Sequence, residues 1–132
     1  MTDELSRSEI NAAMQLTCEA RFDYFVEQVA NHGDIWILAN DQDQFLKIYS
    51  EEDEFEYLPV WPHSALALEY AKTAEEVLKP KSLTLVQFFN RWIPGLTEDG
   101  LDVGVFPTKD KIVWIMHPAE LKADLQKEIA RR

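Results

Sequence analysis

The chain has 132 residues, of which 46% are hydrophobic, so its length and composition predict one folded domain over residues 1–132. Its formal net charge of −11 argues against nucleic-acid binding, which needs clustered basic residues. No apolar run approaches the roughly 18 residues that a membrane span requires, and the acidic N-terminus lacks the order of a secretion signal. Cys18, the single cysteine, allows no intrachain disulfide. We therefore expect a cytoplasmic protein with no membrane segment.

The negative charge is concentrated in the first part of the chain. Residues 1–56 contain 14 acidic and 3 basic residues, whereas residues 57–132 contain 10 of each. The densest segment is residues 51–56, in which every residue except Phe55 is acidic. Such a distribution can give one face of a domain a negative field, which influences steering and partner choice more than the fold.

The first predicted element is one long amphipathic helix over residues 7–31. Ser6 and Glu9 have the spacing of a capping box at its start, and Gly33 follows its end as a left-handed cap. Apolar residues recur along the helix at steps of three and four, so they share one stripe. Cys18 belongs to this stripe, and we expect its thiol to be buried.

A hairpin is predicted after this helix. Residues 35–38 and 45–49 are its two strands, and the polar residues 41–44 form its turn. Residues 57–61 alternate in polarity as a further strand. Pro59 places that strand at the edge of the sheet, because proline cannot donate a ladder hydrogen bond.

The middle of the chain is predicted to be mainly helical. A helix opens at residues 61–64 and continues to about Ala71, and residues 73–81 form a connector. Thr84 begins the next helix with a second capping box, and this helix stops by Pro94 because proline and the following glycine break helices.

A second hairpin and a final helix complete the chain. The strands of this hairpin are residues 101–106 and 111–116, and the helix begins after His117, with proline at its favoured first position. The pattern predicts the α+β class: a mainly antiparallel sheet built from two hairpins plus an edge strand, with about four helices packed on it. Gly104, inside a strand, indicates a bulge or an aromatic ring packed close to the backbone.

Our leading functional hypothesis is a non-enzymatic protein-interaction module that presents its acidic segment to a basic protein. Charge attraction speeds such an encounter, and aromatic side chains supply anchors. An inhibitor or immunity protein that acts on a basic toxin or nuclease is one concrete form of this hypothesis. The expected partner-binding residues are the acidic segment and the aromatic residues in and after it: Glu51, Glu52, Asp53, Glu54, Phe55, Glu56, Tyr57 and Trp61.

The alternative hypothesis is an enzyme or small-ligand-binding protein with a pocket near Trp61, His63 and His117. Each histidine follows a predicted strand and begins a helix, so the two could meet at one end of the sheet, or each could simply cap its helix. A homo-oligomer that pairs through the edge strand at residues 57–61 is a third hypothesis.

Other kinds of chemistry find no support in the sequence. The histidines and Cys18 do not have metal-ligand spacing, and the four glycines form neither a phosphate-binding loop nor a dinucleotide fingerprint. No catalytic motif surrounds any serine or carboxylate. We therefore expect no metal, no cofactor and no recognisable catalytic residues.

Five segments together resemble a known family. They are Phe22–Phe25 (FDYF), Asp34–Leu38 (DIWIL), Tyr57–His63 (YLPVWPH), Phe89–Leu96 (FNRWIPGL) and Val103–Pro107 (VGVFP). In this order they resemble the bacterial family catalogued as domain of unknown function 2750, and the resemblance covers most of the chain. It implies a small bacterial cytoplasmic protein, and it supplies neither an activity nor catalytic residues that could be assigned to this chain.

Overall fold

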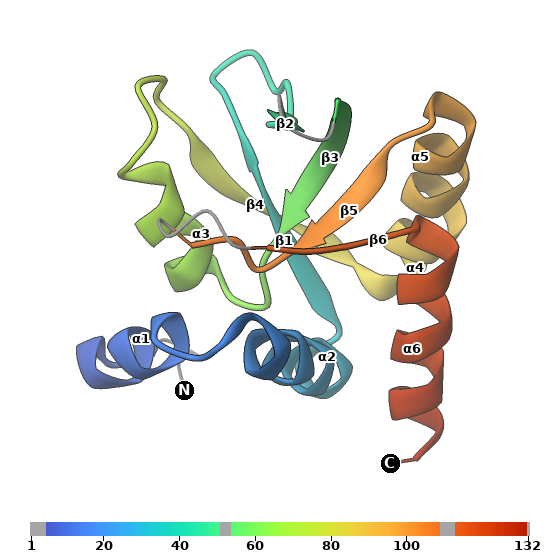
Figure 1. Ribbon diagram of the computed structural model, residues 1–132, viewed down its shortest axis with the longest axis horizontal. Coiled ribbons are helices and arrows are strands. Elements are labelled where there is room, and N and C mark those ends of the chain that lie inside the picture. The colour runs from blue at the N-terminus through green and yellow to red at the C-terminus, as the bar shows by residue number, and fades with distance from the viewer. Residues whose placement is uncertain (1–4, 51–53, 109–112, 132) are drawn as a thin grey trace.

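The computed structural model describes residues 5–50, 54–108 and 113–131 (Figure 1). These residues form helices and two β-sheets, so the predicted α+β class is confirmed. In chain order the elements are α1 (Arg7–Met14), α2 (Cys18–His32), β1 (Asp34–Ala39), β2 (Ile48–Ser50), β3 (Phe55–Val60), α3 (Ser64–Ala71), β4 (Lys79–Thr84), α4 (Leu85–Gln87), the π-helical η1 (Phe88–Trp92), α5 (Ile93–Asp99), β5 (Asp102–Val105), β6 (Trp114–Met116) and α6 (Pro118–Ala130).

The two sheets meet at a pair of tryptophans. β1 pairs antiparallel with β4, and the other sheet has the order β2-β3-β5-β6. β3 and β5 are parallel, whereas the other strand pairings in the described residues are antiparallel. Trp36 in β1 and Trp61 just after β3 exchange two backbone hydrogen bonds of 2.9 Å, which join the sheets.

Helices cover the sheets and enclose the core with them. In Figure 1, α1 and α2 lie along the bottom of the view, α3 lies at the left and α6 at the right. α2 contributes Phe25 and Val29 to the core, and α6 contributes Leu121 and Leu125, all with no exposed surface. Full burial of each such side chain stabilises the fold by about 1.5–3 kcal/mol, so these apolar stripes hold the two helices in place.

The N-terminal helix is divided in two, so the prediction of one helix over residues 7–31 is wrong. α1 begins as expected, because the Ser6 hydroxyl accepts the Glu9 backbone N–H at 3.1 Å in a capping box. Thr17 then caps a new helix by accepting a backbone N–H at 3.2 Å. A threonine hydroxyl competes in this way with the helical backbone. Cys18 consequently becomes the first residue of α2, and it is half-buried rather than buried.

The partner of β1 also differs from the prediction. Residues 45–49 do not return along β1 as a strand: Phe45 bridges to Ala39, and β2 pairs with β3 instead. The strand beside β1 is β4, which begins inside the predicted connector over residues 73–81. β4 contains Pro80, two lysines and few apolar residues, so its sequence does not have a strand pattern.

β3 lies inside the four-stranded sheet, so the edge position predicted for residues 57–61 is wrong. Pro59 lies opposite Gly104 of β5. The sheet accommodates this proline because β2 pairs with β3 only as far as Tyr57, which leaves Pro59 with a neighbouring strand on one side. Residues 57–61 are all buried, so a homo-oligomer contact through this strand finds no support.

The helix that Thr84 caps continues to Asp99, past the stop expected at Pro94. The π-helical segment η1 precedes the proline, and the Ile93 backbone N–H donates to the Phe88 carbonyl five residues back. This wider turn changes which carbonyl faces the proline ring, so the clash that normally ends a helix is avoided.

The C-terminal elements agree with the prediction where they are described. β5 and β6 form the second hairpin, and part of its predicted turn and second strand, residues 109–112, lies outside the described residues. α6 begins after His117 with Pro118 as its first residue. Gly33 ends α2 with a φ of 80°, a left-handed conformation that favours glycine.

Candidate functional site

The predicted acidic segment is only partly described. Residues 51–53 lie outside the described residues, so the expected roles of Glu51, Glu52 and Asp53 stay predictions. Glu54 and Glu56 are exposed at the start of β3. Charge at this point of the surface is therefore accessible to a partner.

The aromatic anchors expected beside this segment are largely inaccessible. Phe55 is half-buried, and its ring centroid lies 6.1 Å from that of Tyr57. Tyr57 is only 7% exposed because its ring lies against Gly104, where a Cβ atom would overlap it, as the glycine's position in the sequence suggested. This burial raises the pKa of Tyr57 to about 12. Trp61 has no exposed surface, and its indole N–H donates to the Pro107 carbonyl at 3.1 Å.

The two histidines are helix caps at opposite ends of the sheet. The Nδ1 atoms of His63 and His117 accept backbone N–H groups of α3 and α6 at 3.2 Å and 3.0 Å. β3, which leads to His63, is parallel to β5, whereas β6, which leads to His117, is antiparallel to β5. The strand directions therefore separate the histidines, so they do not meet at one end of the sheet.

Three carboxylates line the exposed face of α2. Glu19, Asp23 and Glu27 follow one another at intervals of four residues, so they lie on one stripe of the helix. In the part of the chain that the structure describes, no ion pair joins Glu19 or Asp23 to a lysine or arginine. The four-residue spacing of these carboxylates is the sequence signal for this stripe. The sequence-based hypothesis chose the denser acidic run at residues 51–56 instead.

An aromatic pair of one exposed and one half-buried ring adjoins this stripe. The Trp114 ring of β6 stacks on Phe22 of α2, with ring centroids 5.1 Å apart and planes at 22°. Trp114 remains 38% exposed, which no pattern in its short strand predicted. Phe22 lies one helical turn after Glu19, so apolar and charged surface meet here. We call this combination the α2 surface: Glu19, Phe22, Asp23, Glu27 and Trp114.

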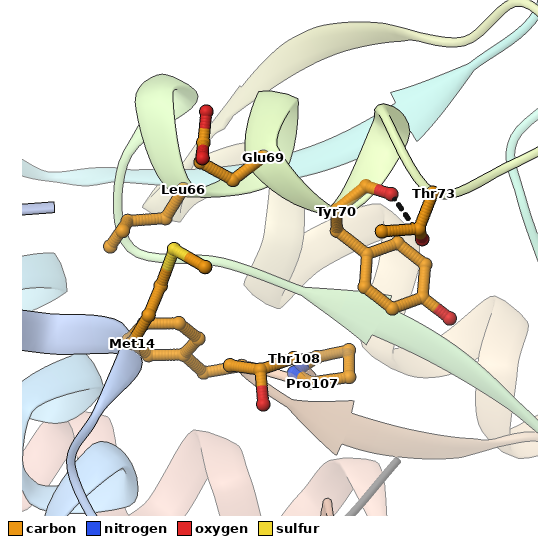
Figure 2. A pocket seen from close by; sticks show the side chains of 8 residues that line it. Met14, Leu66, Glu69, Tyr70, Thr73, Pro107 and Thr108 are labelled. Carbon is orange, nitrogen blue, oxygen red and sulfur yellow. Dashed lines mark hydrogen bonds between the residues drawn. The ribbon is translucent and has the colours of Figure 1, made fainter. Parts of the chain in front are cut away.

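A groove of about 400 Å³ lies between α1 and α3. A smaller pocket adjoins it and has a volume of about 20 Å³. Figure 2 shows Leu66 and Glu69 of α3 above this pocket, Met14 of α1 at its left and Pro107 below it, with the Thr73 hydroxyl bonded to the Tyr70 carbonyl. The residues that line the wider groove are Arg7, Asn11, Met14, Gln15, Glu69, Lys72, Thr73 and Thr108.

Glu69 is the electrostatic centre of this groove. Its Oε1 atom accepts from the Arg7 guanidinium at 2.7 Å, and its Oε2 atom accepts from the Lys72 ammonium at 2.6 Å. Hydrogen bonds from Arg7 and then Lys72 lower the pKa of Glu69 to about 2, against a weaker opposing effect of burial. The carboxylate therefore stays ionised and connects α1 to α3.

A buried arginine supports the loop at the end of the groove. Arg21 of α2 is 1% exposed, and its guanidinium donates to the Thr108 hydroxyl and lies 5.9 Å from the centre of the Phe106 ring. Phe106 has a φ of 52°, which is strained for a bulky residue. Its backbone N–H donates to the Val60 carbonyl at 2.8 Å, which helps to hold it in this conformation.

The described residues show neither a metal-binding cluster nor a membrane-spanning helix. Within residues 5–50, 54–108 and 113–131, no group of three His, Cys, Asp or Glu side chains is placed to hold a metal ion. In the same ranges, every helix falls short of the length and apolar character needed to cross a bilayer. Several carboxylates bind basic side chains instead: Asp41 lies 3.6 Å from Lys79, and Asp43 lies 2.8 Å from Lys81.

The fold and these surfaces define a small α+β protein with a carboxylate-rich helix face. The chain belongs to the family described as Protein of unknown function (DUF2750), whose model matches residues 22–125. This match covers most of the chain and confirms the family resemblance of its sequence motifs. No curated protein matches the chain.

Proposed function

We propose that this protein is a non-enzymatic interaction module of the bacterial cytoplasm, and that its α2 surface binds a basic protein. The observation that carries the proposal is the coincidence of Glu19 and Asp23, which make no ion pair with any described lysine or arginine, with the exposed Trp114 stacked on Phe22. Charge and an aromatic anchor therefore occupy one continuous surface.

Repulsion between carboxylates along α2 favours a basic partner. Like charges four residues apart destabilise a helix by about 0.2–0.5 kcal/mol per pair, and Asp23 makes such a pair with both Glu19 and Glu27. A basic partner that approaches this stripe relieves the repulsion and replaces it with attraction. The same charges increase the association rate through electrostatic steering.

Trp114 and Phe22 supply the apolar part of the proposed interface. Tryptophan is enriched among the residues that contribute most to binding energy, because it buries a large area with little loss of rotamer freedom. The ring of Trp114 is already held by its stack on Phe22, so binding has little further ordering cost. Glu54 and Glu56 add to the long-range negative field.

The alternative of a ligand pocket near Trp61, His63 and His117 is not favoured. Trp61 has no exposed surface, and the strand directions place the histidines at opposite ends of the sheet. An interaction surface therefore explains more of the exposed chemistry than a pocket built on these three residues.

Affinity capture from a native lysate, at low and at high salt, tests the proposal. The matched baits are the wild type, the α2 variant Glu19→Gln/Asp23→Asn and the control Asp41→Asn/Asp43→Asn, which also removes two carboxylates. We expect the wild type and the control to retain one basic protein at low salt, and the α2 variant to lose it. Retention by all three baits, or by none, contradicts the proposal.

A further inference from the structure

The groove between α1 and α3 concentrates positive charge in an acidic protein. Residues 1–56 contain only three basic residues, and two of them, Arg7 and Arg21, lie at this groove or directly behind its end. Lys72, directly after α3, adds a further cation, and Glu69 is the single acidic residue among the described residues that line the groove. The summed charge of these described residues is therefore opposite in sign to that of the whole chain.

Glu69 holds the two exposed cations without hiding them. Its side chain is only 11% exposed, whereas those of Arg7 and Lys72 are 60% and 61% exposed. Each cation donates to one carboxylate oxygen, and a guanidinium has five N–H groups and an ammonium three. Both cations consequently have donors left for a ligand, and their positions are fixed before it binds.

The remaining walls of the groove suit a small ligand with a polar head. One face of α1 and its C-cap carries Arg7, Asn11 and Gln15, which follow one another at intervals of four residues. This face presents one guanidinium and two amides to the groove. The adjoining pocket of about 20 Å³ has room for roughly one water molecule or methyl group. Its walls include the apolar side chains of Met14 and Phe106.

We infer that this groove binds a small organic anion, with its carboxylate or phosphate on the N–H groups of Arg7 and Lys72 that do not bond to Glu69, and with its short apolar end against Met14 and Phe106. The two side chains supply the charge-assisted hydrogen bonds by which proteins hold such groups. The strained backbone of Phe106 supports the assignment, because strain of this kind clusters at ligand-binding sites. The inference does not depend on the α2 surface and can fail independently of it.

Titration of ¹⁵N-labelled protein, followed by amide NMR shifts, tests the inference. The probes are inorganic phosphate and butyrate, each compared with sodium chloride at equal ionic strength. We expect saturable shifts at α1 and at residues 69–73 that chloride does not produce. Tighter saturation by phosphate assigns the acidic group as a phosphate, and tighter saturation by butyrate assigns it as a carboxylate.

Matched variants show whether the shifts come from this groove. Lys72→Met and Arg7→Met each remove one charge-assisted contact, so we expect each to weaken binding about ten-fold. Lys79→Met, which removes an exposed lysine of β4, leaves the affinity unchanged. The inference is overturned if neither probe produces saturable shifts, or if both groove variants bind as tightly as the wild type.

Discussion

The carboxylates after β1 and the carboxylates on α2 have different fates in the same acidic half of the chain. Asp41 and Asp43 lie 3.6 Å and 2.8 Å from lysines of β4, so the fold itself compensates them. Glu19 and Asp23 make no such pair within the described residues. The contrast shows that net charge alone does not locate an interaction surface, because pairing within the fold decides which charges stay available.

The largest expected effect concerns the aromatic anchor. Trp114→Ala removes the exposed ring that stacks on Phe22, and we expect the affinity for the captured basic partner to fall at least about 30-fold, as for an interface hot spot. Tyr49→Ala is the matched control, because Tyr49 is an aromatic residue that is 55% exposed on β2. Calorimetric titration measures both, and equal losses in the two variants would remove the special role of the α2 surface.

The charges on α2 are expected to have the next largest effect. Glu19→Gln/Asp23→Asn should weaken partner binding about ten-fold at low salt, because two steering and contact charges are lost. The difference from wild type should shrink at high salt, where exposed charges are screened beyond about 3–10 Å. The same titration on Asp41→Asn/Asp43→Asn should match the wild type, since the lysines of β4 already compensate those carboxylates.

Glu69 is a further carboxylate that ion pairs within the fold compensate, so its removal should cost stability. Its pKa is lowered to about 2, so its ion pairs contribute stability above the ordinary value of 4.5 and lose it as the pH falls toward 2. Glu69→Gln should lower the free energy of unfolding by about 1–2 kcal/mol at pH 7, after allowance for the exposed cations. Urea unfolding between pH 7 and pH 2 checks this. A variant that loses stability with acid as steeply as wild type would contradict it.

The smallest expected effect is a change in the free energy of unfolding, which should have opposite signs for carboxylates on α2 and for those after β1. Asp23→Asn removes two like-charge pairs on α2 and should raise the free energy of unfolding by about 0.4–1 kcal/mol at low salt. Asp43→Asn removes an exposed ion pair with Lys81 and should lower it by up to about 1 kcal/mol. Asparagine is a suitable replacement at position 43, where φ is 61°, because it tolerates this conformation. Changes of the same sign in both variants would contradict the comparison.

Features that depend on local chemistry could be predicted from the sequence. Ser6 and Thr84 form the expected capping boxes, and Gly33 ends α2 in the expected left-handed conformation. His63 and His117 cap the helices that follow them. Each of these depends on residues a few positions apart, so the spacing in the chain carries the information.

Features that depend on distant contacts could not be predicted in this way. β4 is a strand because it lies beside β1, although Pro80 and its lysines have weak strand character. Pro59 is tolerated inside a sheet because the pairing of β2 with β3 ends at Tyr57. The groove likewise depends on the meeting of Arg7 with Glu69, which are 62 positions apart.

The most direct test of the account is to map the captured basic partner onto ¹⁵N-labelled protein by amide NMR shifts. We expect the largest shifts at residues 19–27 of α2 and at residues 113–115 around Trp114, and we expect them to fade as salt is raised. Shifts that centre instead on residues 54–56 of the acidic segment, or on the groove between α1 and α3, would contradict the assignment of the α2 surface as the interface.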